Sequence, residues 1–289
     1  MQLHVQYFEI TTAMHRIKVL SRHFTTATTT PVCLVLGAGA GIGSHVASKF
    51  SGEGYHAVLC RRSNGKKLQE SVDEIKNNGG SATGYLLNAV KPDAIEDLVR
   101  TIEKDIGPIT VAVYNLGSQI GTVPLTKTTD KSFEMGWRLG TFGLFRLAKS
   151  VLPKMAARGH GTLLVTSATS AVRGNAGQHS HAASMGGRRL LCQTLNAEYA
   201  SKNIHVAHVV VDGAVDAPDT LGKMLGPELF QQMKDQHVDG FISPRQVADT
   251  YWHLHQQHRS ARSFEIDIRS WSDNAWFNSP VNLNKKLPV

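Results

Sequence analysis

A short apolar run that leads into closely spaced glycines constrains this chain more than any other feature. Residues 32–36 are apolar throughout, and a helix is predicted to begin at Ile42. The glycines between and around them stand at alternate positions, at Gly37, Gly39, Gly41 and Gly43. Glycine permits a tight turn and a close backbone approach to a ligand, and the first turn of a helix attracts anions. A buried strand, a glycine turn and a helix in this order indicate a turn that holds a diphosphate.

The rest of the chain alternates between apolar segments and amphipathic ones. Strands are predicted at 32–36, 56–60, 83–87, 109–114, 162–166, 204–211 and 264–268. Helices are predicted at 42–50, 65–78, 92–106, 130–158, 178–200 and 244–255. The strands are apolar without strict alternation, as expected when helices cover both faces of a sheet. The pattern predicts an α/β, Rossmann-type, doubly wound parallel sheet of about seven strands with helices on both faces.

Composition excludes several other classes of protein. Of the 289 residues, 41% are hydrophobic and 19% are charged, which supports a sizeable core and argues against general disorder. No apolar run reaches the length of a membrane span. The three cysteines are too few and too scattered for a disulfide framework or a zinc site, and they favour a reducing compartment.

The positive charge of the chain does not by itself indicate nucleic-acid binding. Lys and Arg exceed Asp and Glu by 31 − 23, a formal net charge of +8. The basic residues are dispersed in short pairs, whereas nucleic-acid binders gather them on one face. We therefore expect no nucleic-acid partner. An anionic cofactor or small-molecule substrate fits the charge equally well.

The two ends of the chain differ from its body, so the predicted division is 1–30, 31–270 and 271–289. The first segment has one acidic residue, Glu9, and its Ile17, Leu20 and Phe24 stand at helical spacing among basic residues. This composition is typical of a mitochondrial transit peptide and predicts a matrix protein, with Met14 as a second candidate initiator. The alternative is a cytoplasmic protein with a poorly ordered tail. The central segment is a single domain, and the last is a polar C-terminal tail that holds aromatic residues.

The turn after the second strand indicates which dinucleotide is bound. An acidic residue at this place favours the 2′-hydroxyl of NAD, whereas an arginine accommodates the 2′-phosphate of NADP. Arg61 and Arg62 stand here, with no acid between Gly54 and Lys67. NADP is therefore predicted as the cofactor in preference to NAD, although the two arginines could instead be merely solvated.

Several motifs together resemble the short-chain dehydrogenase/reductase family over about residues 31–269. The spacing of Gly37, Gly41 and Gly43 matches the family's glycine motif, and 114–117 resembles its Asn-Asn-Ala-Gly motif. Asn88 and Ala89 stand where the family's Asp-Val contacts adenine. With the two arginines, the cofactor-binding residues implied are Gly37, Gly39, Gly41, Ile42, Gly43, Arg61, Arg62, Asn88, Ala89, Asn115 and Gly117.

The catalytic Asn, Ser, Tyr and Lys of that family are absent from the corresponding positions. These positions fall on Gly140, Ala168, His181 and Met185, so the chain resembles an atypical member lacking the tetrad. A shifted alignment would supply the hydroxyl of Ser167 or Ser170, but no tyrosine lies near His181.

His181 is the one candidate catalytic residue. An imidazole, with a pKa near 6.5, exchanges protons at neutral pH without the nearby cation that a phenol needs, so its pairing with the uncharged Met185 is coherent. Arg188, seven residues further on, is expected in a surface or interface ion pair. The other histidines lack a carboxylate cluster, so no metal site is predicted.

Two functions remain open. The first is an NADP(H)-binding oxidoreductase that acts on a carbonyl/alcohol pair, with His181 in place of the usual Tyr. The alternative is a catalytically inactive, cofactor-binding pseudoenzyme that acts as a sensor or scaffold; non-redox chemistry in the same pocket is a third. The family resemblance implies a homodimer or homotetramer that pairs the helices at 130–158 and 178–200. The substrate is a small molecule whose identity the segment 214–240, a predicted lid, does not reveal.

Overall fold

The computed structural model describes residues 30–117 and 121–273. Its strands are β1 (Val32–Leu36), β2 (His56–Arg61), β3 (Ser81–Leu86), β4 (Ile109–Tyr114), β5 (Gly161–Ala168), β6 (Ile204–Val211) and β7 (Glu265–Ile268). Its main helices are α2 (Ile42–Gly52), α3 (Gly65–Asn77), α4 (Ala94–Asp105), α5 (Asp130–Trp137), α6 (Gly143–Arg158), α7 (His179–Tyr199), α8 (Lys223–Leu225), α9 (Pro227–Asp235) and α10 (Pro244–Gln256). The predicted targeting segment and nearly all of the predicted C-terminal tail lie outside the described residues.

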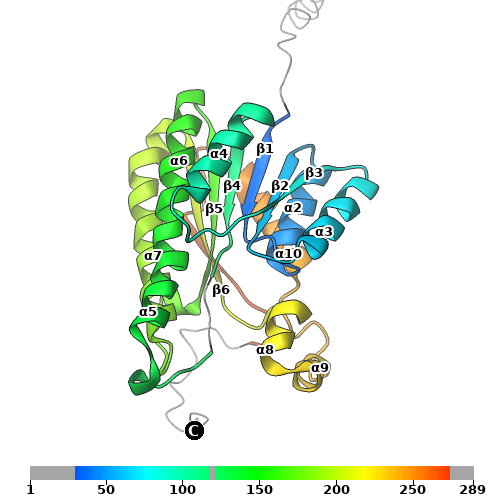
Figure 1. Cartoon of the computed structure of the whole chain (residues 1–289), viewed down its shortest axis with the longest axis vertical. Helices are drawn as coiled ribbons and strands as arrows, with labels where there is room; N and C mark the ends of the chain where they lie inside the picture. Colours follow the sequence, from blue (N-terminus) through cyan, green and yellow to red (C-terminus); the bar gives the residue numbers. More distant parts are fainter. Residues whose placement is uncertain (1–29, 118–120, 274–289) are drawn as a thin grey trace, which may run out of the picture. The chain divides into compact units, whose positions relative to one another are not determined.

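The strands form one parallel sheet of seven in the order β3-β2-β1-β4-β5-β6-β7. The order reverses next to β1, because β2 follows on one side of it and β4 lies on the other (Figure 1). Leu36 pairs with both Cys60 and Tyr114, so β1, β2 and β4 end at the same level. The predicted doubly wound fold is confirmed.

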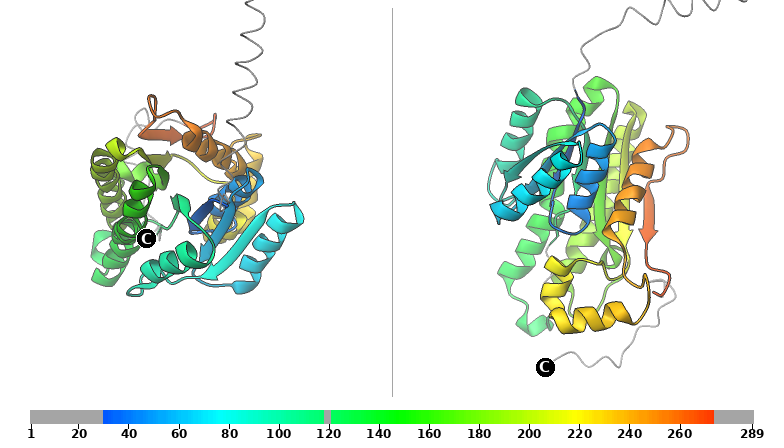
Figure 2. Two further views of the ribbon diagram at one scale, coloured as in Figure 1. Left: turned by 90° about the horizontal axis from the view of Figure 1, so that it is seen from above. Right: turned by 90° about the vertical axis from the view of Figure 1, so that its right-hand side faces the viewer.

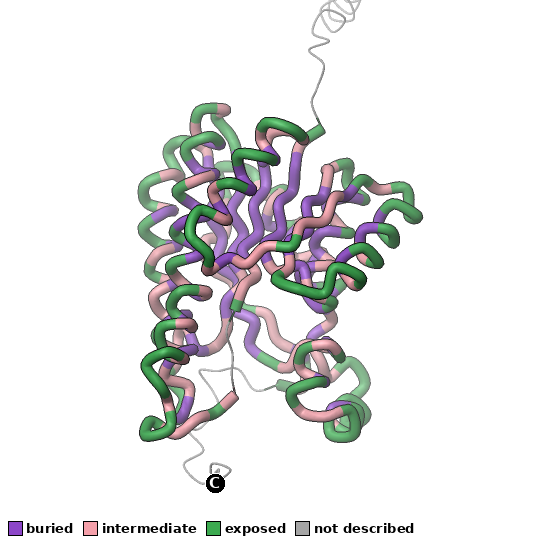
Figure 3. The backbone as a smooth tube through the Cα atoms, viewed as in Figure 1, coloured by how far each residue is buried: buried purple, intermediate pink, exposed green. Residues whose placement is uncertain are grey.

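Helices cover both faces of this sheet, and each face has its own apolar cluster. Alternate side chains of β1 divide between them: Val32, Leu34 and Leu36 pack with α4, α6 and α7, whereas Cys33 and Val35 pack with α2, α3 and α10. Figures 1 and 2 show the two helix layers on opposite sides of the strands. Because both faces are covered, the central strands are buried along their length (Figure 3).

The long helix predicted at 130–158 is present and contains a π-helical turn. A π-helical turn at Arg138–Phe142 separates α5 from α6. The turn lies against α7, where a Cβ atom added at Gly140 would come within 1.5 Å of the Ser184 hydroxyl oxygen. The predicted helical extent of 130–158 is therefore confirmed, whereas the π-helical turn within it was not predicted, because the amphipathic pattern carries no sign of this close approach to α7.

The segment between β6 and α10 contains helices that the sequence did not indicate. A π-helical turn at Pro218–Gly222 leads into α8 and then α9, which begins at Pro227 directly after a left-handed Gly226 with φ +85°. In Figure 1, α8 and α9 project beyond the carboxyl ends of the strands, as α5 does on the other side. Among the described helices, none is both long and apolar enough to span a bilayer.

Candidate active site

The carboxyl ends of β1 and β4 meet where the strand order reverses, which is where open α/β sheets bind ligands. The glycine turn follows β1, and Asn115 follows β4 directly. The backbone N–H of Asn115 donates to the Leu36 carbonyl oxygen at 2.8 Å, and its side-chain amide donates to the Gly37 carbonyl oxygen at 2.9 Å. Asn115 thus braces the glycine turn from the neighbouring strand.

The glycine turn has no room for side chains at two of its positions. Gly37 has φ +99°, and a Cβ there would lie 2.6 Å from the Asn115 carbonyl oxygen. At Gly43 a Cβ would lie 2.2 Å from the Gly37 carbonyl oxygen. Gly39, by contrast, faces open space. The turn is therefore a cradle of bare backbone with one open side, which suits a bound phosphate.

The helix that follows the cradle begins at Ile42, and its N-cap residue, Gly41, provides no side-chain cap. The positive end of this helix is thus turned toward the cradle without a local side-chain acceptor. The bare backbone of the turn and the uncapped N-terminus of α2 together fit the diphosphate of a dinucleotide. At Gly41 a Cβ would lie 3.2 Å from the Ala217 side chain, so the segment that leads to α8 also touches the cradle.

Arg61 and Arg62 lie beside the cradle. The backbone N–H groups of Gly37 and Ala38 both donate to the Cys60 carbonyl oxygen, at 3.0 and 2.8 Å, which joins the end of β2 to the glycine turn. Arg61 is half-buried and Arg62 is exposed. Within the described part of the chain, neither guanidinium has an ion-pair partner, so both remain available to an anion.

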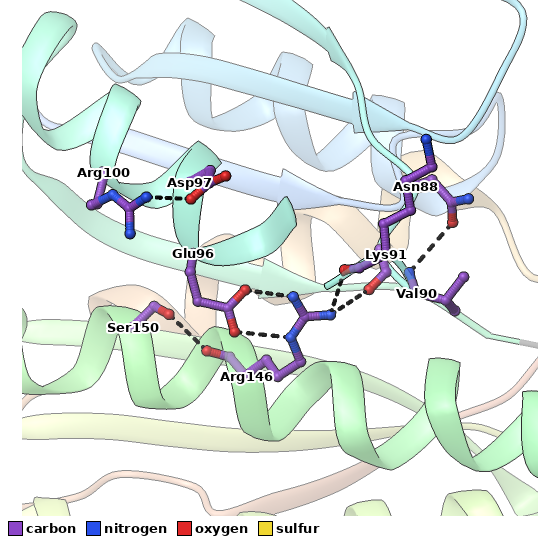
Figure 4. A network of polar contacts seen from close by, with 9 residues as sticks. Asn88, Val90, Lys91, Glu96, Asp97, Arg100, Arg146 and Ser150 are labelled. Carbon is purple, nitrogen blue, oxygen red and sulfur yellow. Dashed lines mark hydrogen bonds and ion pairs between the residues drawn. The ribbon is translucent and has the colours of Figure 1, made fainter. Parts of the chain in front are cut away.

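The loop after β3, with Asn88 and Ala89, is held by an arginine that sequence reasoning missed. Arg146 on α6 donates to the carbonyl oxygens of Ala89 and Lys91, each at 3.0 Å, and forms a two-pronged ion pair with Glu96 (Figure 4). Asn88 closes a short turn by accepting from the Val90 N–H at 3.4 Å. No local pattern marks Arg146, since its partners lie 50 to 57 residues away in sequence.

A pocket of about 230 Å³ opens beside the turn that contains Asn115. It brings together residues from the ends of β4 and β5 and from one face of α7. The lining residues are Asn115, Leu116, Gly117, Thr166, Ser167, Ala168, His181, Met185 and Arg188. Three of the four positions inferred from the family resemblance, those of Ala168, His181 and Met185, therefore meet in one pocket, and no tyrosine is among the described residues that line it.

His181 lies in the first turn of α7 and is 8% exposed. Burial lowers the pKa of its imidazole, and the positive charge of Arg188 lowers it further. Its Nδ1 atom is buried and has no hydrogen-bond partner among the described residues. The ring is therefore neutral near pH 7, and its Nδ1 is a buried polar atom that no described residue satisfies.

Of the residues that line the pocket with His181, Thr166 and Ser167 carry hydroxyl groups, and Ala168 and Met185 have apolar side chains. The Ser167 hydroxyl lies 3.9 Å from the Met185 sulfur and is the serine of the shifted alignment that lines the pocket. Ser170 instead donates to Gln178 at 2.8 Å. Gly140 packs against α7 beneath the pocket, and a Cβ there would also lie 3.1 Å from the Met185 methyl group.

Arg188 is not at the surface, so the expected surface or interface ion pair was wrong. It is 2% exposed, and its guanidinium donates to the carbonyl oxygens of Gly140 (2.7 Å), Thr166 and Leu116. The seven-residue spacing correctly placed it on the face of α7 that carries His181. The error concerned the burial of that face, which depends on packing against β4, β5 and the π-helical turn.

No group of histidine, cysteine, aspartate or glutamate side chains suited to a metal ion occurs within 30–117 and 121–273. On α10, His253 is exposed, whereas His255 shares hydrogen bonds with the Tyr55 hydroxyl at 2.6 Å and the Thr162 hydroxyl at 2.9 Å.

Comparison with known proteins agrees with this arrangement. A family model described as short chain dehydrogenase matches residues 31–224, about two thirds of the chain. A 3-oxoacyl-[acyl-carrier-protein] reductase of Thermotoga maritima is 29% identical over 189 residues, which are 65% of this chain and 76% of the relative. The 7alpha-hydroxysteroid dehydrogenase of Escherichia coli is 28% identical over 200 residues, which are 69% of this chain and 76% of the relative.

Solved structures show the same likeness. A short-chain dehydrogenase from Rhodopseudomonas palustris matches with a TM-score of 0.70 at 30% identity, covering 83% of this chain and 98% of its own. The family match, the named reductases and dehydrogenases among the relatives and the shared fold agree with one another. The chain belongs to the short chain dehydrogenase family and is an NAD(P)-dependent oxidoreductase of that type.

Proposed function

We propose that the protein is an NADP(H)-dependent oxidoreductase for a carbonyl/alcohol pair, with His181 as the residue that gives or takes the proton. The observation that carries this proposal is the position of His181. Its imidazole, with an unpaired Nδ1, lines the same pocket as Asn115 and Gly117, which follow β4 at the edge of the dinucleotide cradle. A proton-transfer group and the cofactor cradle thus meet at one end of the sheet.

The cradle would hold the diphosphate through the backbone of Gly37, Gly39, Gly41, Ile42 and Gly43. Asn88 and Ala89 would border the adenine, and Gly117 the nicotinamide end, with Asn115 keeping the two turns together. The bound cofactor supplies or accepts a hydride. The chain's own residues bind and orient it, exclude water and exchange the proton.

The choice of NADP over NAD rests on Arg61 and Arg62. Both stand at the end of β2 next to the cradle, and each could form a charge-assisted hydrogen bond with a 2′-phosphate. Replacing both by alanine should weaken NADPH binding about tenfold or more and leave NADH binding nearly unchanged. NADPH fluorescence titration measures this, with Arg100→Ala as the control for a lost exposed arginine. Tighter binding of NADH than of NADPH by the native protein would reverse the assignment.

His181 is neutral at pH 7, so it is ready to accept the proton of an alcohol. Carbonyl reduction needs the protonated ring, which forms only at lower pH because burial and Arg188 disfavour the charge. Alcohol oxidation should therefore persist at neutral pH, whereas carbonyl reduction should gain rate as the pH falls. Ser167 supplies a hydroxyl that can hydrogen-bond the substrate oxygen.

The decisive experiment combines cofactor binding with turnover. NADPH is titrated into the purified protein, and its oxidation is then followed with a panel of ketones, aldehydes and quinones. His181→Ala should abolish turnover and leave NADPH affinity within about threefold, while the matched variant His179→Ala should keep both. Binding without turnover, identical in native protein and His181→Ala, would eliminate the enzymatic role of His181.

The inactive, cofactor-binding protein is the second candidate. It is favoured by Gly140, Ala168 and Met185, which offer no proton donor or acceptor at the positions inferred for the tetrad. Restoring a single group would not rebuild that tetrad, because a side chain at Gly140 has no space beside Ser184. Tight NADPH binding, with no oxidation across the carbonyl panel, would support the sensor or scaffold role.

A homodimer or homotetramer is also proposed. Exposed aromatic side chains gather on α5, the π-helical turn and α6: Trp137 and Phe142 stack at 5.1 Å between ring centroids, and Phe142 and Phe145 at 6.2 Å. An exposed apolar patch of this kind supports self-association. Sedimentation analysis should show a dimer or tetramer that Phe145→Asp weakens.

The predicted mitochondrial location and the division at residue 31 stay predictions. Import into isolated mitochondria followed by amino-terminal sequencing tests both. A mature protein that has lost most of residues 1–30 supports matrix targeting, and one that begins at Met1 favours the cytoplasm.

A further inference from the structure

The buried guanidinium of Arg188 is an uncompensated positive charge in the wall of the proposed nicotinamide pocket. Arg188 forms no ion pair with any residue in 30–117 or 121–273. Its hydrogen bonds go to three backbone carbonyl oxygens, which come from the turn after β4, from β5 and from the π-helical turn. Carbonyl groups satisfy the N–H donors of a guanidinium, but they carry no net charge to cancel its own.

The titratable groups that face Arg188 are all neutral near pH 7. Burial raises the pKa of Tyr114 to about 12 and that of Cys192 to about 12, and it also raises the pKa of Tyr251. Burial lowers the pKa of His181, and it lowers that of His208 to about 4. None of these five groups supplies a negative charge, and Glu265, which contacts His208, is paired with Arg189. The dipoles of the three carbonyl groups and the Tyr114 ring, whose centroid lies 5.1 Å from the guanidinium carbon, weaken the field of Arg188 but carry no net charge to cancel it.

A dinucleotide in this pocket would meet that field at its nicotinamide end. The oxidised nicotinamide ring carries a positive charge and the reduced ring carries none, while the rest of the cofactor is the same. A nearby buried cation therefore weakens the binding of the oxidised form only. For two unit charges about 10 Å apart in a medium of effective dielectric constant about 20, this repulsion changes an equilibrium by a factor on the order of ten.

We infer that Arg188 selects the redox state of the bound cofactor. The site should bind NADPH more tightly than NADP⁺, which is the preference expected of a reductase. This inference rests on the proposed NADP(H) function and extends it. Arg188 also acts as a positioning residue, because its three carbonyl contacts hold together the segments that line the pocket.

The test measures dissociation constants rather than activity. NADPH, NADP⁺ and 2′-phospho-ADP-ribose, which lacks the nicotinamide, are titrated into native protein by calorimetry. Native protein should bind NADPH about tenfold or more tightly than NADP⁺. Equal affinities for the two redox states in native protein would overturn the inference, and this result does not depend on any variant.

Three variants then assign the effect to the charge. Arg188→Lys keeps the charge and should keep most of the preference for NADPH. Arg188→Gln removes the charge, so the dissociation constants of NADP⁺ and NADPH should become nearly equal. The affinity for 2′-phospho-ADP-ribose should stay unchanged. Arg189→Gln, at the next position of α7, removes an arginine that pairs with Glu265 at 2.6 Å and should leave the ratio as in native protein.

The outcomes separate this inference from the proposed function. Failure of native protein to bind any of the three ligands would refute the proposed function, and the inference with it. Binding of all three with a ratio that Arg188→Gln does not change would refute only the role of Arg188. Should Arg188→Gln not fold, the ratio in native protein and its retention in Arg188→Lys decide the question.

Discussion

The side-chain amide of Asn115 donates a 2.9 Å hydrogen bond to the carbonyl oxygen of Gly37, and this bond ties the turn after β4 to the turn after β1. The two residues are 78 positions apart in sequence. The bond crosses the point where the strand order reverses, so the shape of the proposed diphosphate cradle depends on the neighbouring strand as well as on its own glycines.

Loss of this bond should loosen the cradle. Asn115→Ala is expected to lower the free energy of unfolding by about 1 kcal/mol and to weaken NADPH binding about tenfold, because the Gly37 carbonyl loses its link to the turn after β4 and keeps only the local Gly39 N–H donor, at 2.9 Å. Urea denaturation and fluorescence titration measure the two effects. The exposed Asn77→Ala serves as the control and should change neither; equal NADPH affinity in Asn115→Ala and native protein would contradict the role of the brace.

Two glycines of the turn should respond differently to alanine. Gly37→Ala places a Cβ 2.6 Å from the Asn115 carbonyl oxygen at φ +99°, so it should destabilise the fold by about 1–3 kcal/mol. Gly39→Ala has free space within the chain and should fold normally, yet weaken NADPH binding if the diphosphate approaches there. Thermal denaturation distinguishes Gly37→Ala from Gly39→Ala, with Gly52→Ala as the reference variant away from the turn. Unchanged NADPH affinity in Gly39→Ala would place the diphosphate elsewhere.

Stability should fall in mild acid because of His255. Burial lowers its pKa to about 4 in the folded chain, whereas the unfolded chain protonates it near its ordinary 6.5. The contribution of His255 is thus fully present above about pH 6.5 and is lost as the pH falls toward 4, by an amount on the order of 2 kcal/mol. Urea denaturation across this range should show a shallower slope for His255→Gln. The exposed His253→Gln should follow the native curve, and an identical slope for both variants would remove His255 as the cause.

The arginine that holds the loop after β3 should matter more than its exposed neighbour. Arg146→Met leaves Glu96 without its partner and frees the Ala89 and Lys91 carbonyl oxygens, so it should cost about 2–3 kcal/mol of stability and weaken binding of the adenosine part. Arg100→Met breaks only the exposed pair with Asp97 and should cost under about 0.5 kcal/mol. Both pairs appear in Figure 4. Similar losses in the two variants would show that Arg146 acts only as a surface residue.

Much of the fold could be predicted because its signals are local. Each strand is a short apolar run, each long helix has an apolar face, and the glycine turn stands between the first strand and the first helix. These patterns led to the doubly wound sheet and to the family, and both are confirmed. The helices at 218–235 were missed, since their short, mixed sequence has no periodicity long enough to detect.

The site was predicted less completely. The sequence correctly placed Arg188 on the face of α7 that carries His181, but the expected exposure of Arg188 was wrong. Arg146 gave no signal, because its partners are residues of another segment. Whether His181 moves a proton stays a prediction, as does the role of each cofactor-binding residue.

The amino-acid order by itself determined the strands, the long helices, the parallel arrangement and the glycine turn, because these follow from patterns among residues close together in the chain. Tertiary structure alone decided that His181, Met185 and Ser167 share a pocket and that Arg188 is buried with carbonyl oxygens for partners. Burial and charge are set by which segments come together, and at this site those segments are separated by 18 to 72 residues.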